Sequence, residues 1–163
     1  MTSANDTDVC QPDGDGGVIL LAREGDGAPT LPVGASFANF GAAEAPVINA
    51  GGDVAFAAGL TVGQGGVTSA NDRGLFFADA EGNLSLVLRE GELITVAPGD
   101  VRTLQDFSLG FDTLNDARQI AVLATFANMG NAILLVTVPE PSSVLLLAFG
   151  LAGLAASRRG RFV

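Results

Sequence analysis

Apolar residues along this chain fall into short runs that are separated by turns rich in glycine, asparagine and aspartate. Leu84, Leu86 and Leu88 alternate with other side chains, as expected for a strand with one buried face. No segment before Ser143 has a helical spacing of apolar residues. Short apolar runs with such turns between them indicate an all-β body. The predicted strands are Val18–Arg23, Ala35–Phe40, Asp53–Leu60, Gly74–Asp79, Leu84–Arg89, Val101–Phe107, Gln119–Phe126 and Ala132–Val138.

The pattern repeats along the chain at a constant offset of 66. DGDGGVILLAREGD at 13–26 aligns without a gap with DAEGNLSLVLREGE at 79–92. NAGGDVAFAAGL at 49–60 aligns with NDARQIAVLATF at 115–126, where Arg118 replaces a glycine and Val122 a phenylalanine. Because two separate matches share one offset, we predict a tandem repeat.

Four strands in each repeat are typical of a β-propeller blade. We therefore expect an all-β fold of about two four-stranded, propeller-like repeats, followed by a C-terminal hydrophobic helix. A β-sandwich or an open meander is the alternative architecture. Propellers need about four to eight blades to close. We therefore expect this chain to be the C-terminal part of a longer protein.

The composition divides the chain into three regions. Residues 1–16 are polar and acidic and carry no signal peptide, so we expect a disordered or incomplete segment. Residues 17–137 form the β-repeat body, with units at about 17–82 and 83–137. Residues 138–163 form a tail, with a transmembrane helix expected at about 143–157.

The tail has three parts in a fixed order. Pro139-Glu140-Pro141 comes first, and the prolines stop any strand or helix. An apolar run of 13 residues follows, shorter than the roughly 20 of a stable span. It comprises Val144, Leu145, Leu146, Leu147, Ala148, Phe149, Gly150, Leu151, Ala152, Gly153, Leu154, Ala155 and Ala156. Arg158, Arg159 and Arg161 then predict a cytoplasmic end.

These three parts together resemble a PEP-CTERM sorting signal of bacteria that make extracellular polysaccharide. The resemblance implies recognition of Pro139-Glu140-Pro141 by an exosortase, a membrane cysteine transpeptidase. The tail would cross the lipid bilayer transiently and then be removed. The body resembles uncharacterised tandem-repeat surface proteins with such tails, in which Asn-x-x-Gly-x-[Val/Ile]-Ala-Phe and Arg-Glu-Gly-Asp elements recur.

Composition excludes several classes of function. The formal net charge is −10, and an acidic body repels phosphate, so we predict no nucleic-acid partner. The chain has one cysteine, Cys10, and no histidine, which excludes a Ser-His-Asp or Cys-His catalytic set and an ordinary zinc site. We predict no cofactor, no metal and no catalytic residues.

Two motifs remain as candidate sites. Arg23-Glu24-Gly25-Asp26 and Arg89-Glu90-Gly91-Glu92 would form a ligand ring or, as we favour, turns at strand ends. Asp13-Gly14-Asp15-Gly16-Gly17 would bind calcium or form an acidic turn, and we favour the turn. No carboxylate pair stands out for glycoside hydrolysis.

The sequence thus predicts an exported, non-enzymatic surface or extracellular-matrix protein. It would lie in the inner membrane during sorting and then at the cell surface or in the medium. Extracellular polysaccharide is a candidate partner of the body. The alternatives are an exported carbohydrate-active enzyme and a permanently membrane-anchored binding module, each with its site in N-terminal blades outside this sequence.

Overall fold

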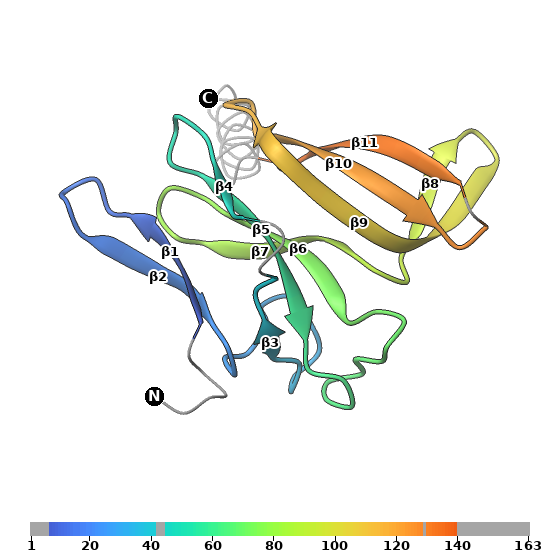
Figure 1. Cartoon of the computed structure of the whole chain (residues 1–163), viewed down its shortest axis with the longest axis horizontal. Helices are drawn as coiled ribbons and strands as arrows, with labels where there is room; N and C mark the ends of the chain where they lie inside the picture. Colours follow the sequence, from blue (N-terminus) through green and yellow to red (C-terminus); the bar gives the residue numbers. More distant parts are fainter. Residues whose placement is uncertain (1–6, 42–44, 129, 140–163) are drawn as a thin grey trace, which may run out of the picture.

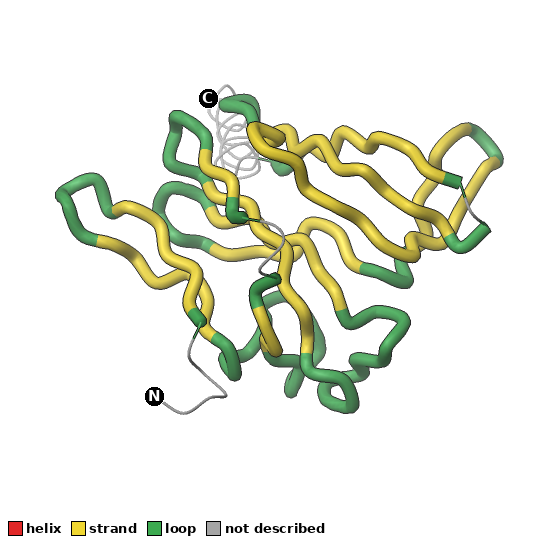
Figure 2. The backbone as a smooth tube through the Cα atoms, in the orientation of Figure 1, coloured by secondary structure: helices red, strands yellow, loops and turns green. Residues whose placement is uncertain are grey.

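The computed structural model of the chain describes residues 7–41, 45–128 and 130–139 (Figure 1). All regular structure in these ranges is β-strand, and Figure 2 shows strands joined by loops and turns. This confirms the predicted all-β class. Within these ranges no helix is long and apolar enough to cross a membrane. The predicted transmembrane helix at 143–157 lies outside the described residues.

In the described part of the chain, eleven strands form three antiparallel sheets, which follow one another across Figure 1 in chain order. The first sheet pairs β1 (Asp8–Pro12) with β2 (Val18–Arg23). The second contains β3 (Phe37–Asn39), β4 (Val47–Ile48), β5 (Val54–Leu60), β6 (Arg73–Ala78) and β7 (Leu84–Arg89). The third has the order β11-β10-β9-β8, with β8 (Leu93–Ala97), β9 (Asp100–Leu114), β10 (Gln119–Phe126) and β11 (Asn131–Thr137).

The second sheet is buried on both faces, because a separate hydrophobic core lies on each side. The N-terminal core joins it to the first sheet and contains Val9, Ala22, Phe37, Phe56 and Phe76. The C-terminal core joins it to the third sheet and contains Leu75, Phe77, Phe107, Ile120, Val122 and Phe126. Alternate side chains of β5 and β6 therefore enter different cores. This explains why both strands consist almost entirely of apolar residues.

The first two sheets share a pairing scheme at the offset found in the sequence. In the β1–β2 hairpin Val9 lies opposite Ala22, and in the β6–β7 hairpin the repeat equivalents Leu75 and Leu88 lie opposite one another. The remaining pairs of the two hairpins correspond at the same offset, and so does the irregularity after Val9 and after Leu75. A propeller would need a closed ring of such sheets, so the propeller arrangement stays a prediction.

The strand β1 was not predicted, and it replaces the expected disorder for Asp8–Pro12. Only Val9 supplies an apolar residue to the core, so the sequence of β1 has no clear apolar alternation. Its other buried residue is Gln11, whose Nε2 donates to the backbone oxygens of Asp79 and Ala80 in the turn between β6 and β7. A strand held by such a distant polar contact leaves no local signal.

Candidate functional site

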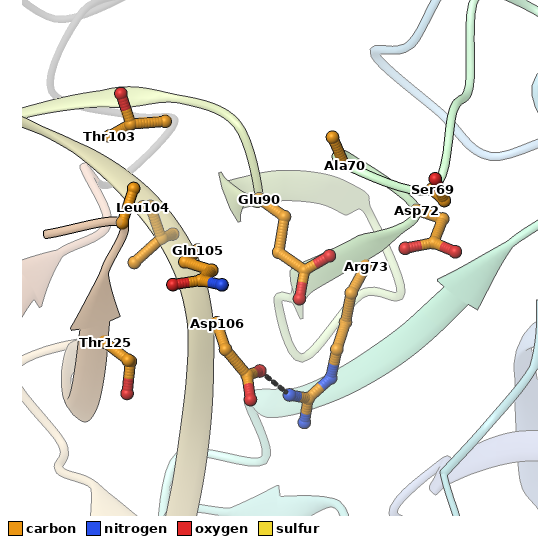
Figure 3. Close-up of a pocket in the computed structure, with 11 residues that line it drawn as sticks. Ser69, Ala70, Asp72, Arg73, Glu90, Thr103, Leu104, Gln105, Asp106 and Thr125 are labelled. Carbon is orange, nitrogen blue, oxygen red and sulfur yellow. Dashed lines mark hydrogen bonds and ion pairs between the residues drawn. The ribbon is translucent and has the colours of Figure 1, made fainter. Parts of the chain in front are cut away.

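A groove of about 810 Å³ lies at the junction of the second and third sheets. Its charged walls come from the start of β6, the turn after β7 and the middle of β9. Figure 3 shows Glu90 lying between Asp72 on one side and Gln105 and Asp106 on the other. The lining residues are Ser69, Ala70, Asp72, Arg73, Glu90, Thr103, Leu104, Gln105, Asp106, Thr125 and Ala127. The groove thus gathers three acids around one arginine.

Arg73 is fixed in this groove by the third sheet. Its Nη1 donates to Asp106 Oδ1 and to the backbone oxygen of Phe107, both at 2.5 Å. The guanidinium also lies over the Phe107 ring, 4.6 Å from its centroid, at a distance suited to a cation–π interaction. Arg73 and Asp106 together line a second hollow of about 470 Å³ as well. The pair therefore forms the wall between the two hollows and joins β6 to β9.

Glu90 is the acid whose protonation the groove changes most clearly. Partial burial raises its pKa to about 7, and the nearby carboxylates of Asp106 and Asp72 add to this effect. Arg73 opposes the rise, while a hydrogen bond with Asp72 supports it. A protonated Glu90 donates that hydrogen bond, whereas an ionised one faces two like charges. Glu90 therefore gains or loses its proton near neutral pH.

We predict that E90Q flattens the pH dependence of stability. The folded protein holds the Glu90 proton up to about pH 7, whereas the unfolded chain releases it near the ordinary pKa of 4.5. The free energy of unfolding of the wild type should therefore fall as pH rises from 4.5 through 7. The groove is partly open to solvent, which screens the charges. We therefore expect the free energy of unfolding of E90Q to exceed that of the wild type by about 1 kcal/mol at pH 8 and to equal it at pH 4. Denaturant titrations at both pH values measure this.

The exposed neighbour Glu92 provides the control, because E92Q keeps Glu90 and should retain the wild-type slope. Equal pH profiles for E90Q and the wild type would show that Glu90 titrates as it does in the unfolded chain.

The two Arg-Glu-Gly motifs are turns at strand ends, as predicted. Gly25 and Gly91 have φ values of 85° and 82°, which favour glycine, and each follows the end of a strand. Arg23 pairs with Asp8 at 2.7 Å, whereas Arg89 Nε donates to the backbone oxygen of Asn71. Glu90 lies in one of these turns, so the sequence did identify it as part of a candidate motif. Nothing in the sequence indicated that Asp72 and Asp106 would lie near it. The ligand-ring alternative stays a prediction.

The acidic segment from Asp13 is a turn in which one carboxylate caps the backbone. Asp13 Oδ1 accepts from the N–H groups of Asp15 and Gly17 at 2.9 and 2.8 Å. Its repeat equivalent Asp79 makes the same contacts to Glu81 and Asn83. Within the described ranges no group of three or more His, Cys, Asp or Glu residues could hold a metal ion. The turn form of this motif is confirmed.

The turns that begin at Asn49 and Asn115 also correspond in the repeat, and they bind one another. Asn49 Nδ2 donates to the backbone oxygen of Asn115 at 3.1 Å. Arg118 reaches back from the second turn and donates through Nε and Nη2 to both oxygens of Asp53, each at 3.1 Å. The Asp53 carboxylate is buried, so this bidentate pair neutralises a charge inside the protein. In the sequence, Arg118 stands out only because it replaces the glycine found at the equivalent position of the first repeat.

Most of the predicted sorting residues lie beyond the described ranges. Pro139 is described and is exposed two residues after β11. Glu140, Pro141, the apolar run from Val144 and Arg158, Arg159 and Arg161 lie outside the described residues. Cys10 is exposed on β1. The described start of the tail meets the turn at Asn115, because the Val138 N–H donates to the backbone oxygen of Arg118.

Two family models match this chain. A PEP-CTERM protein-sorting motif matches residues 137–159, and such a motif directs a protein through the membrane to the cell surface with processing by an exosortase, a membrane enzyme. The second match covers residues 1–145, which include all three sheets. No curated protein and no solved structure matches the chain. The chain therefore carries a PEP-CTERM sorting motif and belongs to a family of unknown function, DUF7453.

Proposed function

We propose that this protein is a non-enzymatic component of a bacterial surface or extracellular matrix. In this proposal an exosortase-type enzyme recognises Pro139-Glu140-Pro141 and removes the tail after it has crossed the bilayer. The observation that carries the proposal is the match of the sorting motif at residues 137–159, at the end of the chain. The other elements of the tail, an apolar run and then arginines, stand in the order that such processing requires.

The position of the motif relative to the folded body supports recognition by an enzyme. β11 ends at Thr137, and the Val138 N–H donates to the backbone oxygen of Arg118 at 2.9 Å. Pro139 has no N–H group and cannot continue the ladder. The Pro139-Glu140-Pro141 element thus begins where the hydrogen-bonded body ends, and Pro139 is exposed. A processing enzyme would reach it without unfolding the third sheet.

The composition of the body supports a structural rather than a catalytic role. The chain has no histidine and a single, exposed cysteine, so the usual nucleophile–base pairs have no base. The net charge of −10 favours solubility outside the cell. We include extracellular polysaccharide as the partner of the body because the tail resembles those of polysaccharide-producing bacteria. The groove around Arg73 offers the polar side chains that a sugar would contact.

We predict that the triple substitution P139A/E140A/P141A blocks tail removal. The variant should remain at full length in the membrane fraction, because the apolar run is not cleaved from the body and holds it in the membrane. The matched control is S142A/S143A, which changes the two adjacent residues and leaves the motif intact, and should be processed like the wild type. Expression in a host with the exosortase, followed by membrane fractionation and immunoblotting, measures both. Processing of the triple variant at the wild-type rate would refute recognition of this motif.

A further inference from the structure

The third sheet presents large apolar side chains to solvent on the face that points away from the C-terminal core. Leu123, Ile133 and Leu135 are 48%, 78% and 63% exposed. Leu123 and Ile133 lie directly opposite one another on β10 and β11. A hollow of about 290 Å³ beside them is lined in part by Leu109 and Gly110. Contiguous apolar residues of this kind on a sheet face mark an interaction site. We name Leu123, Ile133 and Leu135 the trailing face.

The internal register shows what this face is built to contact. The β10–β11 pair Ile120–Val136 corresponds to the β5–β6 pair Val54–Ala78, because Val54 and Ile120 are repeat equivalents. Counting along both strands, the trailing face corresponds to Ala57, Leu75 and Phe77 of the second sheet. These three residues are at most 5% exposed. They belong to the C-terminal core, where they pack against the third sheet. The equivalent positions in the second sheet are therefore covered by the sheet that follows.

The first sheet leaves its opposite face uncovered, the face that points away from the second sheet. Its Cys10, Val18 and Leu20 correspond at the repeat offset to Phe76, Leu84 and Leu86. In the second sheet those residues pack in or against the N-terminal core, toward the sheet that precedes. In the first sheet Val18 and Leu20 are 70% and 46% exposed, and Cys10 is exposed as well. We name Cys10, Val18 and Leu20 the leading face.

We propose that the trailing face of one molecule buries the leading face of a second copy. The two sheet-to-sheet interfaces inside the chain already join a face of the trailing kind to a face of the leading kind. The contact between copies would continue this arrangement, with sheets about 10 Å apart. Because the two faces differ, the association is head-to-tail and adds further copies at both ends. A surface protein with this property would form an open filament, or a ring where the rotation between successive copies closes.

Cys10 allows a direct test, because it is the single cysteine of the chain and lies on the leading face. The variant I133C of the chain 1–163, in mild detergent at physiological ionic strength, is treated with a short bismaleimide cross-linker. Cys10 of one copy then faces the thiol introduced at position 133 of the next, so we expect a ladder of dimers, trimers and larger products. The control V33C introduces a thiol at a fully exposed loop position outside both faces. I133C should cross-link more than about tenfold faster than V33C, since the bound thiols have a high effective concentration.

Two further variants decide how the faces pair. I133C/C10S leaves a thiol on the trailing face alone and should give no products. I133C/L135D places a charge in the interface and should abolish the ladder, while thermal unfolding by circular dichroism confirms an intact fold. Equal cross-linking of I133C and V33C, or a monomer throughout, would overturn the proposal. Dimers of I133C/C10S would overturn it too, because the trailing face would then pair with itself.

Discussion

Replacing Phe76 by alanine is expected to lower the free energy of unfolding by about 3–5 kcal/mol. Phe76 is fully buried in the N-terminal core. Its ring meets Phe37 edge-on with centroids 5.0 Å apart and stacks on Phe56 at 5.8 Å. Truncation removes both ring contacts and leaves a cavity between the first and second sheets. The loss is a large part of the roughly 5–15 kcal/mol that stabilises a typical domain.

Denaturant unfolding followed by far-ultraviolet circular dichroism measures the effect of F76A. The control is F111A, since Phe111 is 90% exposed and its removal should leave the midpoint unchanged. A loss below about 1 kcal/mol in F76A would mean that the N-terminal core does not hold the first two sheets together.

Replacing Arg118 by glycine is expected to cost about 2–3 kcal/mol, although glycine is the residue at the equivalent repeat position. Arg118 has a φ of 55°, so glycine relieves backbone strain there. Against this gain, the buried Asp53 carboxylate loses a bidentate partner. The guanidinium also lies 5.7 Å from the Phe77 ring centroid, and that contact is lost. The uncompensated charge therefore dominates.

The double variant D53N/R118G isolates this cause. It has no buried charge to leave unpaired, so it should be more stable than R118G in the same denaturant titration. R23A is the surface control, because the ion pair of Arg23 with Asp8 is exposed and its loss should leave stability unchanged within error. If D53N/R118G unfolds no later than R118G, the loss comes from the backbone or from packing and not from Asp53.

Strands with their own apolar pattern could be predicted from the sequence, whereas strands defined by their partners could not. Val18–Arg23, Leu84–Arg89 and Gln119–Phe126 have the predicted bounds. β8 alternates with its apolar Leu93 exposed, and β4 has only two residues, so neither carries a clear signal. β9 extends beyond both ends of the predicted strand Val101–Phe107, because β8 and β10 pair with different parts of it.

The groove was hidden for a different reason. Asp72, Glu90 and Asp106 come together only because β6, the turn after β7 and β9 meet where the second and third sheets pack. Their spacing in the sequence is irregular and resembles that of the other acids of the body. The sorting motif, by contrast, is contiguous, and its parts follow one another directly along the chain. A linear motif is therefore visible in the sequence, while a site assembled by sheet packing is not.

The intact mass of the mature protein, purified from a bacterium that makes the exosortase, tests the central claim most directly. If the motif at residues 137–159 directs export and processing, the mature chain ends close to Pro139-Glu140-Pro141. Its mass then lacks the apolar run from Val144 and the arginines beyond it. A mature chain that retains Val163 would contradict processing and would show instead that the tail stays as a permanent anchor.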